Sequence, residues 1–123
     1  MDGVFEQTFP ATLDGLAAGT EFLDGICPNP RLSIVFDEIA SNIVRCSGAG
    51  AFTVRVIKGA ELVLEVIDDG REFDPTRVVD PDINAPVEDR AVGGLGIFMV
   101  RKMSKSFTYA REGGRNRVKV VMA

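Results

Sequence analysis

The chain has 123 residues, 46% of them hydrophobic and 26% charged, which is typical of a soluble globular domain with a buried core. Its net charge of -4 argues against direct nucleic-acid binding. The absence of histidine excludes serine-histidine catalysis, the common zinc-enzyme ligand sets and any phosphohistidine within the chain. No apolar run approaches the roughly 18 residues that span a bilayer, and no secretion signal is visible, so we expect one cytoplasmic domain over residues 1–123. Cys27 and Cys46 lack the spacing of a zinc knuckle or redox pair and are expected to be core thiols.

The first half of the chain predicts a short strand followed by two helices. Residues 4–9 alternate weakly, as a strand does, and Thr12 can cap the helix that follows. The Asn29-Pro30 pair is a strong start signal for the second helix, because asparagine caps and proline fits the first helical position. That helix should run to about Cys46, with Gly48 beyond its end. Its apolar arc is expected to comprise Leu32, Phe36, Ile39, Ala40, Ile43 and Val44.

A polar stripe lies opposite that arc. Glu38, Asn42 and Arg45 recur at i, i+4 and i+7, so their side chains share one face of the helix. Such a stripe is often a solvated surface. It can also line a cleft, where a carboxylate, an amide oxygen and a guanidinium would supply a base, a metal ligand and a phosphate contact.

Two β-hairpins are predicted further along the chain. The first spans residues 52–68 and turns at Gly59-Ala60, with near-continuous apolar character in its second strand. The second spans residues 107–122 and turns at Gly113-Gly114.

The first hairpin ends in two carboxylates, Asp68 and Asp69, followed by Gly70. Because burying an unpaired carboxylate is prohibitive, these acids should reach water, a cation or a donor-rich ligand. Gly70 allows a sharp turn and leaves room for a flat group beside the backbone. A solvated turn is the alternative interpretation.

Between the hairpins, residues 75–91 lose periodicity and form a long loop of the kind that is either a lid or disordered. Gly93, Gly94 and Gly96 then lead into a helix. Backbone N–H groups at the start of a helix, together with the positive end of its dipole, bind phosphate. A flexible hinge is the alternative interpretation of these glycines.

In this order, the motifs resemble the GHKL ATP-binding domain, or Bergerat fold, over about residues 30–120. Within that superfamily the chain is similar to the bacterial anti-sigma-factor serine/threonine kinases. The stretches that carry the resemblance are residues 68–75, 93–97, 109–111 and 114–116. The resemblance implies a two-layer α/β sandwich, with a mixed, largely antiparallel sheet and helices on one face.

The resemblance also implies ATP and Mg²⁺ as cofactors and assigns a role to each candidate residue. Asp68 would accept a hydrogen bond from the adenine amino group, with Gly70 as the flat floor of the pocket. Asn42 would ligate Mg²⁺, and Arg45 would contact the phosphates. The glycines Gly93, Gly94 and Gly96 would lie at the phosphates, and Glu38 would be the general base.

The function implied is that of a regulator that sequesters a sigma factor and phosphorylates a serine or threonine of an anti-anti-sigma (STAS-type) partner, with a homodimer as one form of its assembly. A non-catalytic module that binds a partner when ATP is present is the main alternative. The ATP-binding domain of a split histidine kinase is a third, which the sequence favours less because the chain starts at its own Met1 and has no histidine. Glu72, where glycine or proline is usual, and Cys46, where a polar residue is common, depart from the family pattern.

Overall fold

The structure is a computed structural model that describes residues 2–78 and 94–123. Its strands are β1 (Gly3–Pro10), β2 (Ala51–Lys58), β3 (Leu62–Asp68), β4 (Ser104–Glu112) and β5 (Arg115–Met122). Its α-helices are α1 (Leu13–Ile26), α2 (Pro30–Asn42) and α3 (Gly94–Met103). A π-helical turn η1 (Ile43–Ser47) follows α2, and a 3-10 turn η2 (Pro75–Arg77) follows β3. Apart from its start, the loop predicted over residues 75–91 lies outside the described residues.

The five strands form one sheet in the order β1-β2-β3-β5-β4. All four neighbouring pairs are antiparallel, so the sheet is antiparallel throughout and not mixed. The strands β3 and β4 do run in the same direction, but β5 lies between them because the second hairpin joins the sheet through its second strand. The predicted two-layer sandwich and both predicted hairpins are confirmed.

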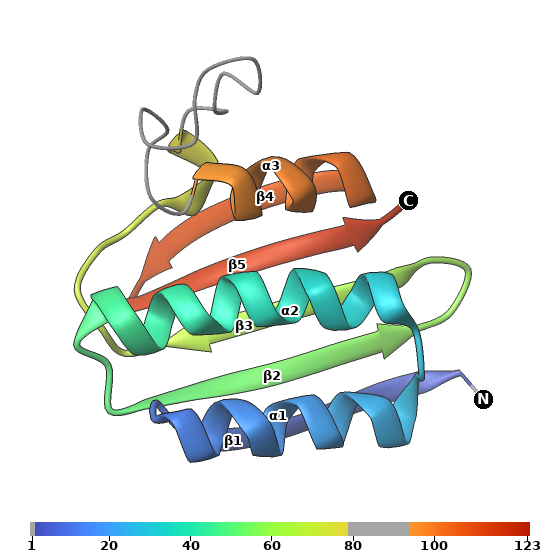
Figure 1. The fold of residues 1–123 in the computed structure, drawn as a ribbon, viewed down its shortest axis with the longest axis horizontal. Helices are drawn as coiled ribbons and strands as arrows, with labels where there is room; N and C mark the ends of the chain where they lie inside the picture. The colour runs from blue at the N-terminus through green and yellow to red at the C-terminus, as the bar shows by residue number, and fades with distance from the viewer. Residues whose placement is uncertain (1, 79–93) are drawn as a thin grey trace.

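The three helices lie on one face of the sheet, with α1 beside β1, α2 over β3 and α3 over β4 (Figure 1). Both predicted caps form. The Thr12 side chain accepts a hydrogen bond from the backbone N–H of Gly15 at 3.0 Å. The Asn29 side chain accepts from the N–H groups of Arg31 and Leu32 at 3.0 and 3.3 Å. These bonds satisfy donors that a helix start otherwise leaves unpaired, so they fix where α1 and α2 begin.

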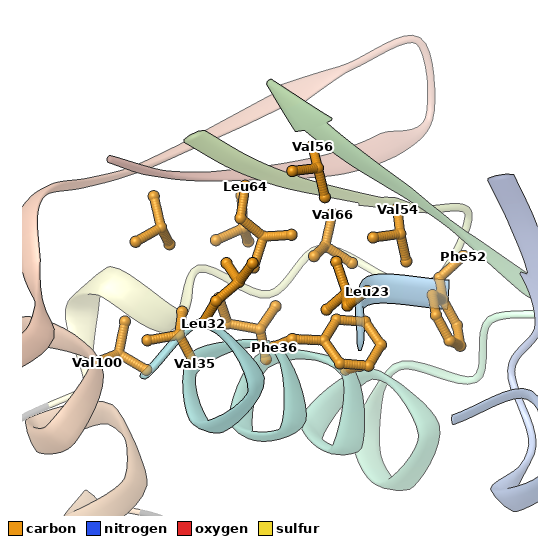
Figure 2. Packing of buried hydrophobic residues seen from close by; sticks show 14 of the residues in the cluster. Leu23, Leu32, Val35, Phe36, Phe52, Val54, Val56, Leu64, Val66 and Val100 are labelled. Atoms are coloured by element: carbon orange, nitrogen blue, oxygen red, sulfur yellow. The ribbon is translucent and has the colours of Figure 1, made fainter. Parts of the chain in front are cut away.

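The core fills the space between the helices and the sheet (Figure 2). The predicted arc of α2 is buried except at Val44, which is half-buried, and Val35 adds to it. The strands contribute alternate side chains, since every second residue of a strand points to the same face. These are chiefly Phe52, Val54, Val56, Leu64, Val66, Val118 and Val120.

Two glycines in α1 exist for close packing. A Cβ on Gly15 would lie 1.8 Å from the carbonyl oxygen of Pro10, and one on Gly19 would lie 2.6 Å from Cζ of Phe36. Glycine lowers helix stability by about 1 kcal/mol relative to alanine. In α1 this loss of stability is accepted because only glycine at these positions lets the helix pack closely against β1 and α2.

The end of α2 differs from an ordinary helix end. The α-helix ends at Asn42, a π-helical turn continues to Ser47, and Gly48 follows with φ +69°. The expectation that Cys46 is a core thiol is wrong: its side chain is exposed, and Ser47 is buried in the widened turn instead. Cys27 is half-buried against the core.

No described helix covers the second face of the sheet. Glu65 of β3 lies on that face, only 5% exposed, and pairs with Arg55 at 3.4 Å and Arg117 at 3.8 Å. None of the helices in residues 2–78 and 94–123 has both the length and the apolar character needed to cross a membrane.

Candidate functional site

Asp68 and Asn42 line one small cavity between α2, the end of β3 and the loop that follows β3. The full lining is Ile39, Asn42, Ile43, Ser47, Asp68, Phe73, Pro75, Asn116 and Val118. The cavity measures about 10 Å³, which is room for about one water molecule. Two residues predicted for opposite ends of a nucleotide thus share one largely apolar hollow.

Within the described residues, Asp68 presents one carboxylate oxygen that accepts no hydrogen bond. The side chain is only 4% exposed. Its Oδ1 accepts hydrogen bonds from the backbone N–H of Gly70 at 2.8 Å and from Nδ2 of Asn116 at 3.1 Å. Within residues 2–78 and 94–123 no hydrogen bond reaches Oδ2. A buried carboxylate oxygen in the lining of a cavity is a strong acceptor for a ligand's donor group.

Asn116 holds Asp68 and the loop after β3 in place. Its Nδ2 donates to Asp68 and to the carbonyl of Arg71 at 2.8 Å. Its Oδ1 accepts from the Tyr109 hydroxyl at 2.6 Å and from Nη1 of Arg111 at 3.1 Å. Burial, and then the charge of nearby Glu72, raise the pKa of Tyr109, so its hydroxyl keeps its proton for this bond.

Asn116 was not among the predicted site residues. The available signal was its place in β5: it alternates with Arg115 and Arg117 and shares the inward face with Val118. An amide at a core-facing strand position needs buried partners.

The loop after β3 is tied down at both ends and closes the cavity. Nε of Arg71 donates to the carbonyl of Cys46 at 2.8 Å, and Nη2 donates to the same oxygen. Nη2 of Arg101 in α3 donates to the carbonyl of Thr76 at 2.8 Å. Between these ties, Phe73 and Pro75 line the cavity. As it stands, the cavity therefore has no room for a group larger than water.

Gly70 is required by a contact with the π-helical turn. A Cβ on Gly70 would lie 2.6 Å from both Cβ and Oγ of Ser47. The side of Gly70 on which a Cβ would lie is thus occupied by Ser47, which itself lines the cavity. Gly70 contributes to the site by letting the turn approach the end of β3.

The predicted polar stripe of α2 forms a chain of hydrogen bonds. Nδ2 of Asn42 donates to Oε1 of Glu38 at 3.3 Å. Nη2 of Arg45 donates to Oδ1 of Asn42 at 2.7 Å, and its Nε donates to the carbonyl of Ser41 at 3.3 Å. One turn of helix separates each pair, so the chain leads from the cavity at Asn42 to Glu38.

Glu38 lies under the start of α3. A Cβ on Gly96 would lie 1.9 Å from Cδ of Glu38, so any larger residue at this position would displace the Glu38 carboxylate. Burial raises the pKa of Glu38 above its ordinary value of 4.5, while Arg45 and the hydrogen bond from Asn42 oppose the shift. A carboxylate with a raised pKa is a better proton acceptor than an exposed one.

Residues 17–122 match the family described as the histidine kinase-like ATPase domain. This range includes every residue that lines the cavity. The chain belongs to this family. A stretch of 91 residues is also 29% identical to the serine/threonine-protein kinase BtrW of Bordetella bronchiseptica, covering 69% of this chain. That stretch spans 63% of the length of BtrW, which is less than two thirds.

As a histidine kinase-like ATPase domain, the chain has residues that fit ATP. The apolar lining suits a purine ring, and the unpaired Oδ2 of Asp68 suits its amino group. No group of three or more Cys, Asp or Glu side chains in the described part of the chain could hold a metal alone. Asn42 offers one amide oxygen, which fits Mg²⁺ because this ion is commonly bound by few protein ligands together with nucleotide phosphates.

The predicted glycines lie at the start of α3. Gly94 is its first residue and Gly96 its third, whereas Gly93 lies outside the described residues. Glu72 is exposed and is not part of the cavity lining. Asp69 points away from the cavity, where its Oδ1 accepts from the N–H groups of Gly50 and Ala51.

Proposed function

We propose that residues 1–123 form one cytoplasmic ATP-binding domain that transfers the γ-phosphate of ATP to a serine or threonine of an anti-anti-sigma, STAS-type partner. In the same proposal, the domain sequesters a sigma factor when the partner is unavailable, and a homodimer is the expected assembly. The observation that carries the proposal is the shared cavity of Asp68 and Asn42, continued along α2 by Glu38.

At one end of the site, Asp68 would select adenine. Its Oδ2 accepts a hydrogen bond from the amino group, and Asn116 keeps the carboxylate aimed at the cavity. A hydrogen bond to a charged group contributes about 1.5–3 kcal/mol. Since the cavity holds only about one water, binding includes an outward shift of Phe73 and Pro75.

At the other end, α2 and α3 would hold the phosphates. Mg²⁺, when bound, neutralises phosphate charge and orients the transferred group. Asn42 would hold the ion through its Oδ1, which now accepts a hydrogen bond from Arg45, and Arg45 would then be free to contact the phosphates. The N–H groups at the start of α3, at Gly94 and Gly96, would donate to the same phosphates. Phosphoryl transfer depends mainly on such positioning and charge neutralisation.

Glu38 would accept the proton of the attacking hydroxyl. The hydroxyl oxygen bonds to the γ-phosphorus while the bond from that phosphorus to its bridging oxygen breaks, and ADP leaves. The raised pKa of Glu38 and its position one turn before Asn42 support this role. The relative BtrW, described as a serine/threonine-protein kinase, supports a hydroxyl acceptor.

Incubation with γ-labelled ATP, Mg²⁺ and candidate STAS-type proteins tests the proposal. We expect acid-stable label on a serine or threonine of one partner. Nucleotide binding with no label anywhere would favour the non-catalytic module, and acid-labile label on a histidine would favour a split histidine kinase. A Glu38→Ala variant should bind ATP and transfer no phosphate; persistent transfer would remove Glu38 from the mechanism.

A further inference from the structure

We propose that a groove across α1, α2 and α3 binds the partner segment that carries the acceptor hydroxyl, and that it selects a segment with an aliphatic and a basic residue beside that hydroxyl. This inference rests on the proposed kinase function and adds the chemistry of its protein substrate.

The groove lies on the other side of Glu38 from the nucleotide cavity. It measures about 390 Å³ and is lined by Thr20, Ser33, Ile34, Asp37, Glu38, Gly96 and Met99. Ile34, Glu38 and Asn42 follow one another at intervals of four residues, so they form one row along α2. The cavity lies at the Asn42 end of this row, and the groove lies at the Ile34 end.

This arrangement suits an in-line transfer. The general base has to contact the acceptor hydroxyl, while the phosphates reach the same point from the opposite side. Gly96 matters here because a side chain at that position would cover the Glu38 carboxylate, which lines the groove. A hydroxyl held in the groove therefore meets the base directly.

The apolar part of the groove calls for an aliphatic side chain. Ile34 is 45% exposed, an unusual degree for a large apolar residue on a helix that otherwise buries its apolar side chains. Met99 faces it from α3 and adapts readily to different shapes. Most of the lining surface is apolar, so burying an aliphatic group there is favourable.

The charged part of the groove calls for a basic side chain. Asp37 and Glu38 both line it, and Asp24 lies at its edge, where it accepts a hydrogen bond from the Ser33 hydroxyl at 3.2 Å. Among the described lining residues, none is basic. Complementary charge favours a lysine or arginine in the bound segment and disfavours acids.

Selection from a peptide mixture tests the groove separately from catalysis. The mixture carries one central serine with degenerate flanking positions and is passed over immobilised protein that holds Mg²⁺ and a non-hydrolysable ATP analogue. We expect enrichment of peptides with an aliphatic and a basic residue near the serine. Ile34→Asp should weaken binding of the selected peptide about tenfold. Asp37→Lys should weaken it about fivefold.

Matched controls lie outside the groove. Leu13→Asp replaces another exposed apolar residue, which is 76% exposed at the start of α1, and Glu21→Lys reverses another exposed acid. Both should leave peptide binding unchanged, and all four variants should bind ATP as the wild type does. No enriched sequence, or enrichment that survives Ile34→Asp and Asp37→Lys, overturns the inference. If the wild-type protein itself does not bind ATP or does not transfer phosphate, the proposed function is contradicted instead.

Discussion

Gly96 and Glu38 are in such close contact that a methyl group on the glycine would lie 1.9 Å from the carboxylate carbon. The contact joins α3 to the polar stripe of α2 at the residue proposed as the base. It explains why a glycine stands inside a helix, where it lowers stability relative to alanine.

Gly96→Ala should therefore push the flexible end of the Glu38 side chain away from α3 and abolish phosphate transfer, with a net stability change of less than about 1 kcal/mol, because alanine also favours the helix. A transfer assay and urea unfolding measure the two effects. Gly25→Ala is the matched control, because among the described residues no neighbouring segment lies within 4 Å of the position that its methyl group would take, and the helix gains about 0.5–1 kcal/mol while transfer is unchanged. If Gly96→Ala transfers phosphate at the wild-type rate, the contact with Gly96 does not position Glu38 for catalysis.

Glu38→Gln should stabilise the protein at neutral pH. Burial raises the pKa of Glu38 in the folded state, so the ionised side chain costs stability as pH rises through and above that pKa. Below the pKa that Glu38 has in the unfolded state, its side chain is protonated in both the folded and the unfolded protein. The stability difference between the wild type and Glu38→Gln should then vanish. Thermal unfolding at neutral pH and at about pH 4 checks this. Glu21→Gln, an exposed position on α1, should change little at either pH.

The same pKa predicts the pH dependence of transfer. Because the base has to be ionised, the rate in the wild type should fall as pH is lowered through a value above 4.5. A rate that stays constant down to that pH would exclude Glu38 as the base.

Asn116→Ala should weaken ATP binding while leaving the residues proposed to contact the phosphates unchanged. The substitution removes the bond to Oδ1 of Asp68 and leaves the carbonyl of Arg71 and the hydroxyl of Tyr109 without their partner. Each lost buried hydrogen bond costs about 1–3 kcal/mol. We expect lower stability and an ATP affinity reduced about tenfold, measured by calorimetry. Unchanged affinity in a folded variant would show that Asp68 needs no support from Asn116.

Much of the fold could be predicted because its signals are local. Thr12 and Asn29 cap helices through atoms only two or three residues away, and the glycine turns define both hairpins. The polar stripe of α2 was predictable for the same reason, since helical spacing alone places Glu38, Asn42 and Arg45 together.

The rest depends on contacts between distant segments. The π-helical turn exposes Cys46 and buries Ser47, and nothing in the spacing of these residues announces a change of helix type. The cavity wall at Phe73 and the network of Asn116 join residues 43 positions apart. That β5 inserts between β3 and β4, which makes the sheet antiparallel throughout, is likewise a property of tertiary packing.

The role of Asp68 as the adenine acceptor is best checked by calorimetric titration of an Asp68→Asn variant with ATP. Asparagine keeps the shape and can still accept from Gly70 and Asn116, but it replaces the unpaired acceptor Oδ2 by a donor. We expect at least tenfold weaker ATP binding, a smaller loss for inosine triphosphate, whose ring carries a carbonyl in place of the amino group, and no change in the neighbouring Asp69→Asn variant. Equal ATP affinity in Asp68→Asn and the wild type would rule out the adenine site proposed at Asp68.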